Sequence, residues 1–68
     1  MKLQGKVLWT SQRDGNGIII VGKTEYYFDR SVCLDFASIN RVREVQVEFE
    51  LNDKIKDCRC AHKVIVLN

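Results

Sequence analysis

Hydrophobic and polar residues alternate along much of this 68-residue chain, and the alternation predicts short β-strands. The clearest case lies at residues 45–51, where apolar side chains alternate with Gln and Glu. Residues 18–21 are β-branched throughout, which disfavours a helix and suits a pleated strand. Residues 2–10, 25–29 and 58–67 are predicted to form three further strands.

Turn-forming residues separate these segments. Residues 11–17 are rich in Gly, Asn and Asp and predict a hairpin connection, and Gly22-Lys23-Thr24 predicts a second tight turn. Residues 52–54 predict a third turn. Residues 30–40 fit one or two helical turns as well as an irregular loop. Five short strands with few residues between them favour a closed or nearly closed sheet, because closure removes edges that would aggregate. The predicted fold class is all-β, a small five-stranded antiparallel Greek-key barrel, in one domain spanning residues 1–68.

Composition narrows the function classes. The chain is 46% hydrophobic and 29% charged, a globular balance, and its net charge is +2 from 11 basic and 9 acidic residues. This charge permits nucleic-acid binding without indicating a strong phosphate binder. No apolar run approaches the ~20 residues of a membrane span, and no hydrophobic region follows the first residues as in a secretory signal. Three cysteines without a disulfide pattern favour a reducing compartment, so we expect a cytoplasmic protein.

Five segments resemble the cold-shock domain family in order and spacing. Residues 5–11 read Gly-Lys-Val-Leu-Trp-Thr-Ser where the family has Gly-Lys-Val-Lys-Trp-Phe-Asn. Residues 14–19 and 26–31 stand for its two ribonucleoprotein motifs, and residues 47–50 and 62–67 for its last two strands. The resemblance implies an OB-fold barrel that binds single-stranded RNA or DNA, as an RNA chaperone or a regulator of gene expression. It implies no cofactor.

The resemblance carries over a binding surface in altered form. Trp9 and Tyr27 keep two of the family's base-stacking rings, whereas Leu8 stands where a lysine is usual. Asn16 and Ile18 replace two phenylalanines of the first motif. We therefore expect weaker or altered binding, since each stacking ring contributes about 1–3 kcal/mol per base. The predicted nucleic-acid-binding residues are Lys6, Trp9, Ser11, Arg13, Asn16, Ile18, Tyr27, Asp29 and Arg30.

Each candidate has a plainer interpretation. Trp9 lies among polar neighbours, which suggests an exposed ring, although a core or rim tryptophan would also fit. Tyr27 faces outward if Phe28 lies in the core, because neighbours in a strand point to opposite sides. Asn16 stands between two glycines and suits a turn with positive φ as well as contact with a base edge. Asp29 replaces a histidine of the family and would repel phosphates.

The basic candidates and the residue near the family's loop aromatic are equally open. Lys6, Arg13 and Arg30 can hold phosphates or remain ordinary solvated charges. Arg30 replaces an aromatic residue of the family, and its guanidinium can also stack on a base. Phe36 lies two residues before the position of the family's loop phenylalanine. It either covers bases or packs inward.

A Cys-x-Cys-x-His series near the end of the chain is the remaining motif. In an extended strand Cys58, Cys60 and His62 point the same way and could bind zinc with Cys33. The single-residue spacing is short for such a site, and the residues share their parity with Val64, which favours small core side chains instead. No metal and no enzymatic activity is predicted. The alternative function is a protein-interaction module, including a homodimer, on the same barrel.

Overall fold

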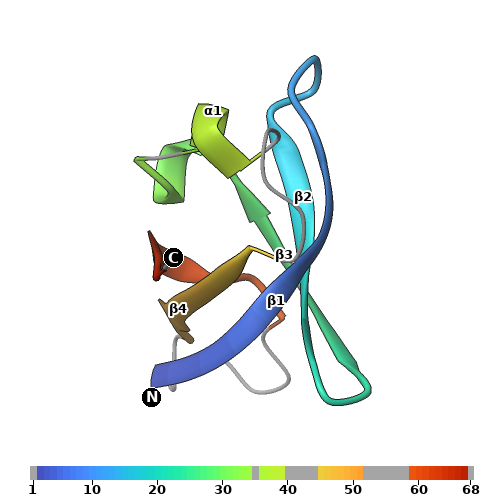
Figure 1. Cartoon of the computed structure of the whole chain (residues 1–68), viewed down its shortest axis with the longest axis vertical. Helices are drawn as coiled ribbons and strands as arrows, with labels where there is room; N and C mark the ends of the chain where they lie inside the picture. The colour runs from blue at the N-terminus through green and yellow to red at the C-terminus, as the bar shows by residue number, and fades with distance from the viewer. Residues whose placement is uncertain (1, 35, 40–44, 52–58, 68) are drawn as a thin grey trace.

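The computed structural model describes residues 2–34, 36–39, 45–51 and 59–67. Within them the chain is all-β, with one sheet of five antiparallel strands in the order β3-β2-β1-β4-β5. The elements are β1 (Lys2–Ser11), β2 (Asn16–Val21), β3 (Thr24–Asp29), the 3₁₀ turn η1 (Arg30–Val32), α1 (Phe36–Ile39), β4 (Gln46–Glu50) and β5 (His62–Val66). The sheet is strongly curled into a half-barrel, and α1 lies at one end of it (Figure 1).

Strand β1 lies in the middle of the curled sheet and pairs with a strand on each side. Its first part, from Lys2 to Lys6, pairs with β4, and its second part, from Lys6 to Ser11, pairs with β2. Isolated parallel bridges also connect the two edges of the sheet. Tyr27 of β3 pairs with Cys60, just before β5, and Cys33, just after η1, pairs with Val64 of β5. The Tyr27 amide donates to the Arg59 carbonyl at 2.6 Å, and the Ala61 amide donates to the Tyr27 carbonyl at 2.7 Å.

The core lies on the concave side of the sheet and follows the two-residue period of the sequence. In β4, Val47 and Phe49 are fully buried, as the alternation predicts. Phe49 packs against Tyr26 at 5.2 Å between ring centroids, and Phe28 meets Phe36 edge to face at 5.7 Å. The buried hydrophobic residues of the described ranges are Ile19, Phe28, Cys33, Phe36, Ile39, Val45, Val47, Phe49, Ala61 and Val64.

A β-bulge interrupts the pairing of β1 with β2. Val7 pairs with Ile19 and Trp9 pairs with Ile18, so Leu8 is the additional residue. At this point the two strands approach closely at Gly17. A Cβ on Gly17 would lie 2.7 Å from the Trp9 carbonyl oxygen and 2.8 Å from the Phe28 ring. The bulge leaves Leu8 and Trp9 both about half exposed.

A second irregularity lies in β5 and corrects one sequence-based interpretation. Lys63 has a positive φ of 49°, and the pairing of β4 with β5 shifts register beside it. Ala61 and Val64, three residues apart, are therefore both buried. The interpretation of Cys60 and His62 as core side chains with the parity of Val64 is wrong, because both are exposed. Cys58 lies outside the described residues.

Most predicted elements are confirmed. Residues 30–40 contain both η1 and α1 rather than an irregular loop throughout. The last strand is shorter than predicted and starts at His62. The turn predicted at residues 52–54 lies outside the described residues. No helix in the described ranges has the length and hydropathy that a membrane span requires.

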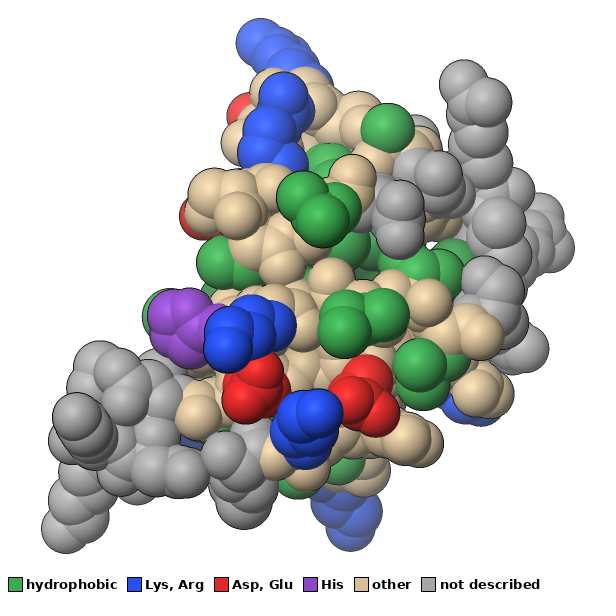
Figure 2. All heavy atoms as spheres, turned by 90° about the vertical axis from the view of Figure 1, so that its left-hand side faces the viewer, with side chains coloured by type: hydrophobic (Ala, Val, Ile, Leu, Met, Phe, Trp, Pro, Cys, Tyr) green, Lys and Arg blue, Asp and Glu red, His purple; other side chains and the backbone are tan. Residues whose placement is uncertain are grey.

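The outer side of the sheet near its β4–β5 edge carries paired charges. Lys2 Nζ lies 3.7 Å from Glu48 Oε1, and Lys63 Nζ lies 3.6 Å from Glu50 Oε2. Figure 2 shows acidic and basic side chains next to one another on one face of the molecule. Exposed ion pairs of this kind contribute about 0–1 kcal/mol each, so they add little to the stability of the sheet.

We expect Gly17→Ala to destabilise the fold by about 1–3 kcal/mol, because the new methyl group would overlap the backbone of β1 and the Phe28 ring. Gly22→Asn is the control. Gly22 has a positive φ that Asn tolerates and open space around it, so this change should have a smaller effect. Urea unfolding followed by circular dichroism measures both. Equal stability of the two variants would contradict the close approach at Gly17.

Candidate functional site

The outer face of β1, β2 and β3 brings most of the predicted site residues together in cross-strand rows. In the central row Trp9, Ile18 and Tyr27 lie side by side on neighbouring strands. The next row contains Ser11, Asn16 and Asp29 in the same way. Residues two apart in a strand point to the same side, so both rows share one face. We call this face the platform.

The two rings of the platform are presented to solvent. Trp9 is 47% exposed and Tyr27 is 55% exposed, while Phe28, next to Tyr27, is buried in the core. The Tyr27 orientation therefore agrees with the one predicted from its alternation with Phe28. Leu8 extends the apolar surface beside Trp9 and is 50% exposed. Flat rings with free faces on a rigid sheet are suited to stacking on planar ligands.

An open hollow of about 500 Å³ lies over the platform. Trp9, Ile18 and Tyr27 line it from the sheet, and Asn16 and Asp29 line it from the second row. The residues that complete its lining are Gly17, Phe28, Ser31, Val32, Cys60, Ala61 and His62. The hollow thus has a floor of apolar side chains and polar groups around them, the composition expected of a small-ligand or base-binding surface.

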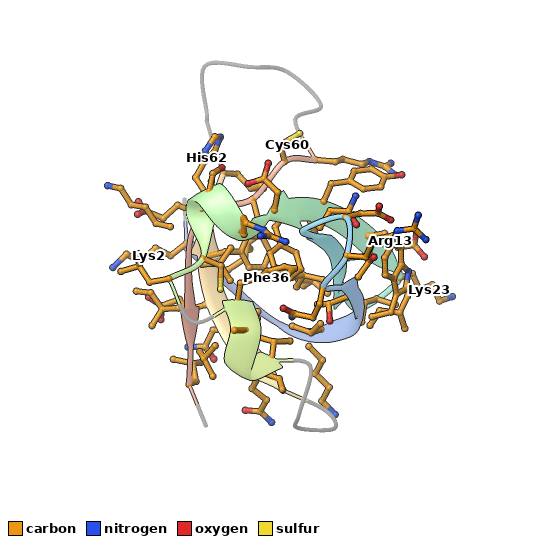
Figure 3. All side chains as sticks on the ribbon, turned by 90° about the horizontal axis from the view of Figure 1, so that it is seen from above. Lys2, Arg13, Lys23, Phe36, Cys60 and His62 are labelled. Atoms are coloured by element: carbon orange, nitrogen blue, oxygen red, sulfur yellow. The ribbon has the colours of Figure 1, made fainter. Side chains whose placement is uncertain are left out.

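Cys60 and His62 are lining residues that the binding-site prediction missed. From the sequence they are candidate metal ligands or core residues only. A regular alternation without the irregularity at Lys63 places them on the same side of the strand as Val64. The bridge between Tyr27 and Cys60 brings this segment to the platform. Figure 3 shows Cys60 and His62 at the same end of the molecule. In the described part of the chain no three His, Cys, Asp or Glu side chains are grouped to hold a metal ion.

Arg30 lies outside the rows and braces the loop between β1 and β2. Its Nη2 donates to the Gln12 carbonyl at 2.7 Å, and its backbone amide donates to the Gly15 carbonyl at 2.9 Å. The guanidinium carbon lies 5.9 Å from the centroid of the Phe36 ring. A phosphate contact by Arg30 stays a prediction, and it would compete with the bond to Gln12.

Phe36 packs inward, which resolves the two interpretations of its sequence position. It is 5% exposed, and its ring meets the edge of Phe28 in the core. Its carbonyl accepts a hydrogen bond from Gln12 Nε2 at 3.0 Å, so α1 and the β1–β2 loop are held together. Figure 3 shows Phe36 near the middle of the molecule, away from Arg13 and Lys23 at the periphery.

Asn16 has a different place from the one its neighbouring glycines suggested. The left-handed position in the turn is taken by Gly15, with a φ of 74°. Asn16 instead starts β2, pairs with Ser11 and Asp29, and is exposed. Its interpretation as a turn residue with positive φ is therefore wrong. The amide group is left on the platform, where contact with a base edge stays a prediction.

Asp29 is held in place by the turn after it. The Ser31 amide donates to Asp29 Oδ1 at 2.9 Å, and the Ser31 hydroxyl donates to the same oxygen. The Ser31 hydroxyl bond is the largest cause that lowers the pKa of the Asp29 carboxyl below 3.8. Desolvation acts in the opposite direction, and backbone amides of Ser31 and Val32 add to the lowering. Asp29 is therefore a fixed, ionised hydrogen-bond acceptor at the rim of the hollow.

Charges around the platform are mixed. Lys6 and Arg13 are exposed cations near it, and Arg13 lies at the opposite end of the β1–β2 face from Lys6. Ser11 Oγ donates to Asp14 Oδ2 at 3.1 Å, which keeps a second carboxylate in the loop. Asp29 adds negative charge within the hollow itself. Phosphate attraction is thus weak here, and rings and hydrogen bonds are the stronger features.

Comparison of the chain with family models, with curated proteins and with solved structures gave no match. The function must therefore be argued from the platform itself.

We expect Ser31→Ala to raise the pKa of Asp29 toward 3.8, because the variant loses the hydroxyl bond and keeps only backbone donors. A carboxyl whose pKa is lowered in the folded state stabilises the fold above its unfolded pKa. This contribution is lost as pH falls through the folded pKa. Carbon NMR titration of the Asp29 carboxyl in the parent chain and in the variant measures the shift. An unchanged Asp29 titration in the variant would contradict the assigned hydrogen bond.

Proposed function

We propose that the chain is a divergent cold-shock-like domain that binds single-stranded RNA or DNA across the platform. The observation that carries the proposal is the row of Trp9, Ile18 and Tyr27 on adjacent strands, in which both rings are exposed. Bases in single strands stack on exposed rings, and each such contact contributes about 1–3 kcal/mol. A duplex would not present its base faces in this way, so unpaired strands are the favoured ligand.

The fold supports the finer assignment to an OB-type barrel. The hydrogen bonds of Tyr27 with Arg59 and Ala61 connect β3 to the segment entering β5. In this sheet one edge strand, β3, bonds to the segment that leads into the other edge strand, β5. Such a contact is consistent with a partly open Greek-key barrel. In OB-folds the face of the second and third strands binds oligonucleotides, and this is the face on which Ile18, Asn16 and Tyr27 lie.

The platform also explains how binding would differ from that of the family. In one row Ile18 stands between two rings, in place of a phenylalanine of the family. In the second row Asn16 stands in place of a phenylalanine and Asp29 in place of a histidine. Loss of rings lowers affinity, while the remaining polar groups can form hydrogen bonds with base edges. We therefore propose that the chain binds nucleic acid more weakly than members of the family do. Hydrogen bonds to base edges would then contribute a larger share of the binding free energy.

We expect a single-stranded heptamer to quench Trp9 fluorescence at low salt, and Tyr27→Ala to weaken binding about tenfold, because one stacking surface is removed. Ile65→Ala is the matched control. Ile65 is an exposed hydrophobic residue on β5 outside the hollow, so its loss should leave affinity unchanged. Titrations at several salt concentrations give the number of phosphates contacted. No quenching by any heptamer at tens of micromolar protein would refute the proposal.

A protein partner, in the simplest case a second copy of the chain, is the alternative for the same surface. The specific observation in its favour is Leu8, an aliphatic residue brought out beside Trp9 by the bulge. Apolar side chains clustered on an exposed face and surrounded by charges are typical of protein interfaces.

Leu8→Lys separates the two functions. We expect it to tighten binding to single strands and to steepen the salt dependence by about 0.7, the increment for one more phosphate contact on a single strand. If the platform instead forms a homodimer, the same change buries a charge in the interface and should dissociate it. Sedimentation velocity over a range of concentrations, with and without the substitution, decides. A parent dimer that Leu8→Lys converts to monomer, with no gain in oligonucleotide binding, would favour the alternative.

A further inference from the structure

The second row of the platform has a hydrogen-bonding pattern of its own. Asn16 and Asp29 lie directly opposite each other on β2 and β3, and both line the hollow. Directly opposed residues have Cβ atoms about 5 Å apart, so an amide and a carboxylate lie side by side. Two residues along β3 stands Tyr27, about 7 Å away on the same face. A base stacked on Tyr27 can therefore extend one edge over the second row.

The Asp29 carboxylate is ready to accept hydrogen bonds from such an edge. The two Ser31 donors both use Oδ1, and a carboxylate has about four acceptor sites in all. The same Ser31 bonds fix the orientation of the carboxylate before any ligand arrives. It accepts only, whereas Asn16 can also donate through its amide nitrogen.

We propose that Asn16 and Asp29 select guanine at the platform by its Watson–Crick edge. Guanine presents N1–H and N2–H next to each other, and Asp29 accepts from both. Its O6 lies beside these donors and accepts from the Asn16 amide. This inference rests on the proposed function, because it needs a base stacked on the platform.

The other bases fit this pair less well. Adenine and cytosine each offer one amino group, but the neighbouring ring nitrogen is an acceptor that faces the carboxylate. Uracil and thymine offer one N–H between two carbonyl oxygens, which the carboxylate repels. In single strands this edge is free for recognition, since it is not paired with another base. Guanine alone among the common bases offers two adjacent donors to the carboxylate together with an acceptor to the Asn16 amide.

In this proposal the negative charge of Asp29 contributes to the choice of base, in addition to repelling phosphates. It disfavours phosphate within the hollow. A strand would therefore bind with its phosphates toward Lys6 and Arg13, the exposed cations near the platform, and with a base toward Asp29. Discrimination between bases by a two-donor contact of this kind corresponds to about tenfold in affinity.

The test compares heptameric oligouridylates that carry one central guanine, adenine, cytosine, uracil or hypoxanthine. We expect the guanine strand to bind about tenfold more tightly than the adenine and uracil strands, measured by fluorescence anisotropy at low salt. Hypoxanthine lacks the N2 amino group, so its strand should lie between guanine and uracil. This intermediate value distinguishes an edge contact from stronger stacking of purines in general.

Asp29→Asn is the matched variant. Its side-chain oxygen can still accept from Ser31, so the turn after β3 is retained. We expect it to reduce the guanine preference to within about twofold. Ile65→Ala, outside the hollow, should keep the full preference.

The outcomes separate the two proposals. Binding of all strands with equal affinity would overturn guanine selection and leave nucleic-acid binding in place. Retention of the guanine preference in Asp29→Asn would also overturn it. Binding of none of the strands would overturn both.

Discussion

The close approach of β2 to β1 at Gly17 is the constraint on which the arrangement of the platform depends. The Trp9 carbonyl oxygen and the Phe28 ring occupy the space that a side chain on Gly17 would need. This contact allows β1 to bulge at Leu8, where two consecutive side chains emerge on the outer face. Without the bulge, the strict alternation of a strand would turn one of Leu8 and Trp9 inward. The position of the indole is thus fixed by backbone packing, and the core on the other side keeps it there.

Much of the sheet and the orientation of the platform could be predicted from the sequence. Alternation around Phe28 and the β-branched run containing Ile19 define which side is buried, and the opposite side then contains Tyr27 and Ile18. The two irregularities could not be predicted. The bulge at Leu8 and the positive φ at Lys63 are single-residue events without a composition signal, yet each reverses the parity of the residues after it. The misassignment of Cys60 and His62 has this cause.

Contacts between segments that lie far apart in the sequence are the second feature that could not be predicted from it. Arg30 is a cation in a polar segment, and composition alone describes it as a solvated charge or a phosphate ligand. In the structure its guanidinium reaches Gln12, eighteen residues away, while Gln12 reaches the carbonyl of Phe36. These bonds join the β1–β2 loop to η1 and to α1, three segments that lie apart in the sequence. They also explain why Phe36 points inward, because the chain around it is tied to the β1–β2 connection.

Under the proposed function, the few cations and the fixed carboxylate of the platform would lower general affinity and leave specificity to other contacts. Phosphate contacts are the same for every sequence, so a binder that relies on them tightens without selecting. On this platform Asp29 would oppose phosphates, and stacking on Trp9 and Tyr27 would tolerate any base. Hydrogen bonds to base edges are then the contacts that differ most in free energy between ligands. The polar pair of Asn16 and Asp29 would therefore shift the balance from general affinity toward choice of base.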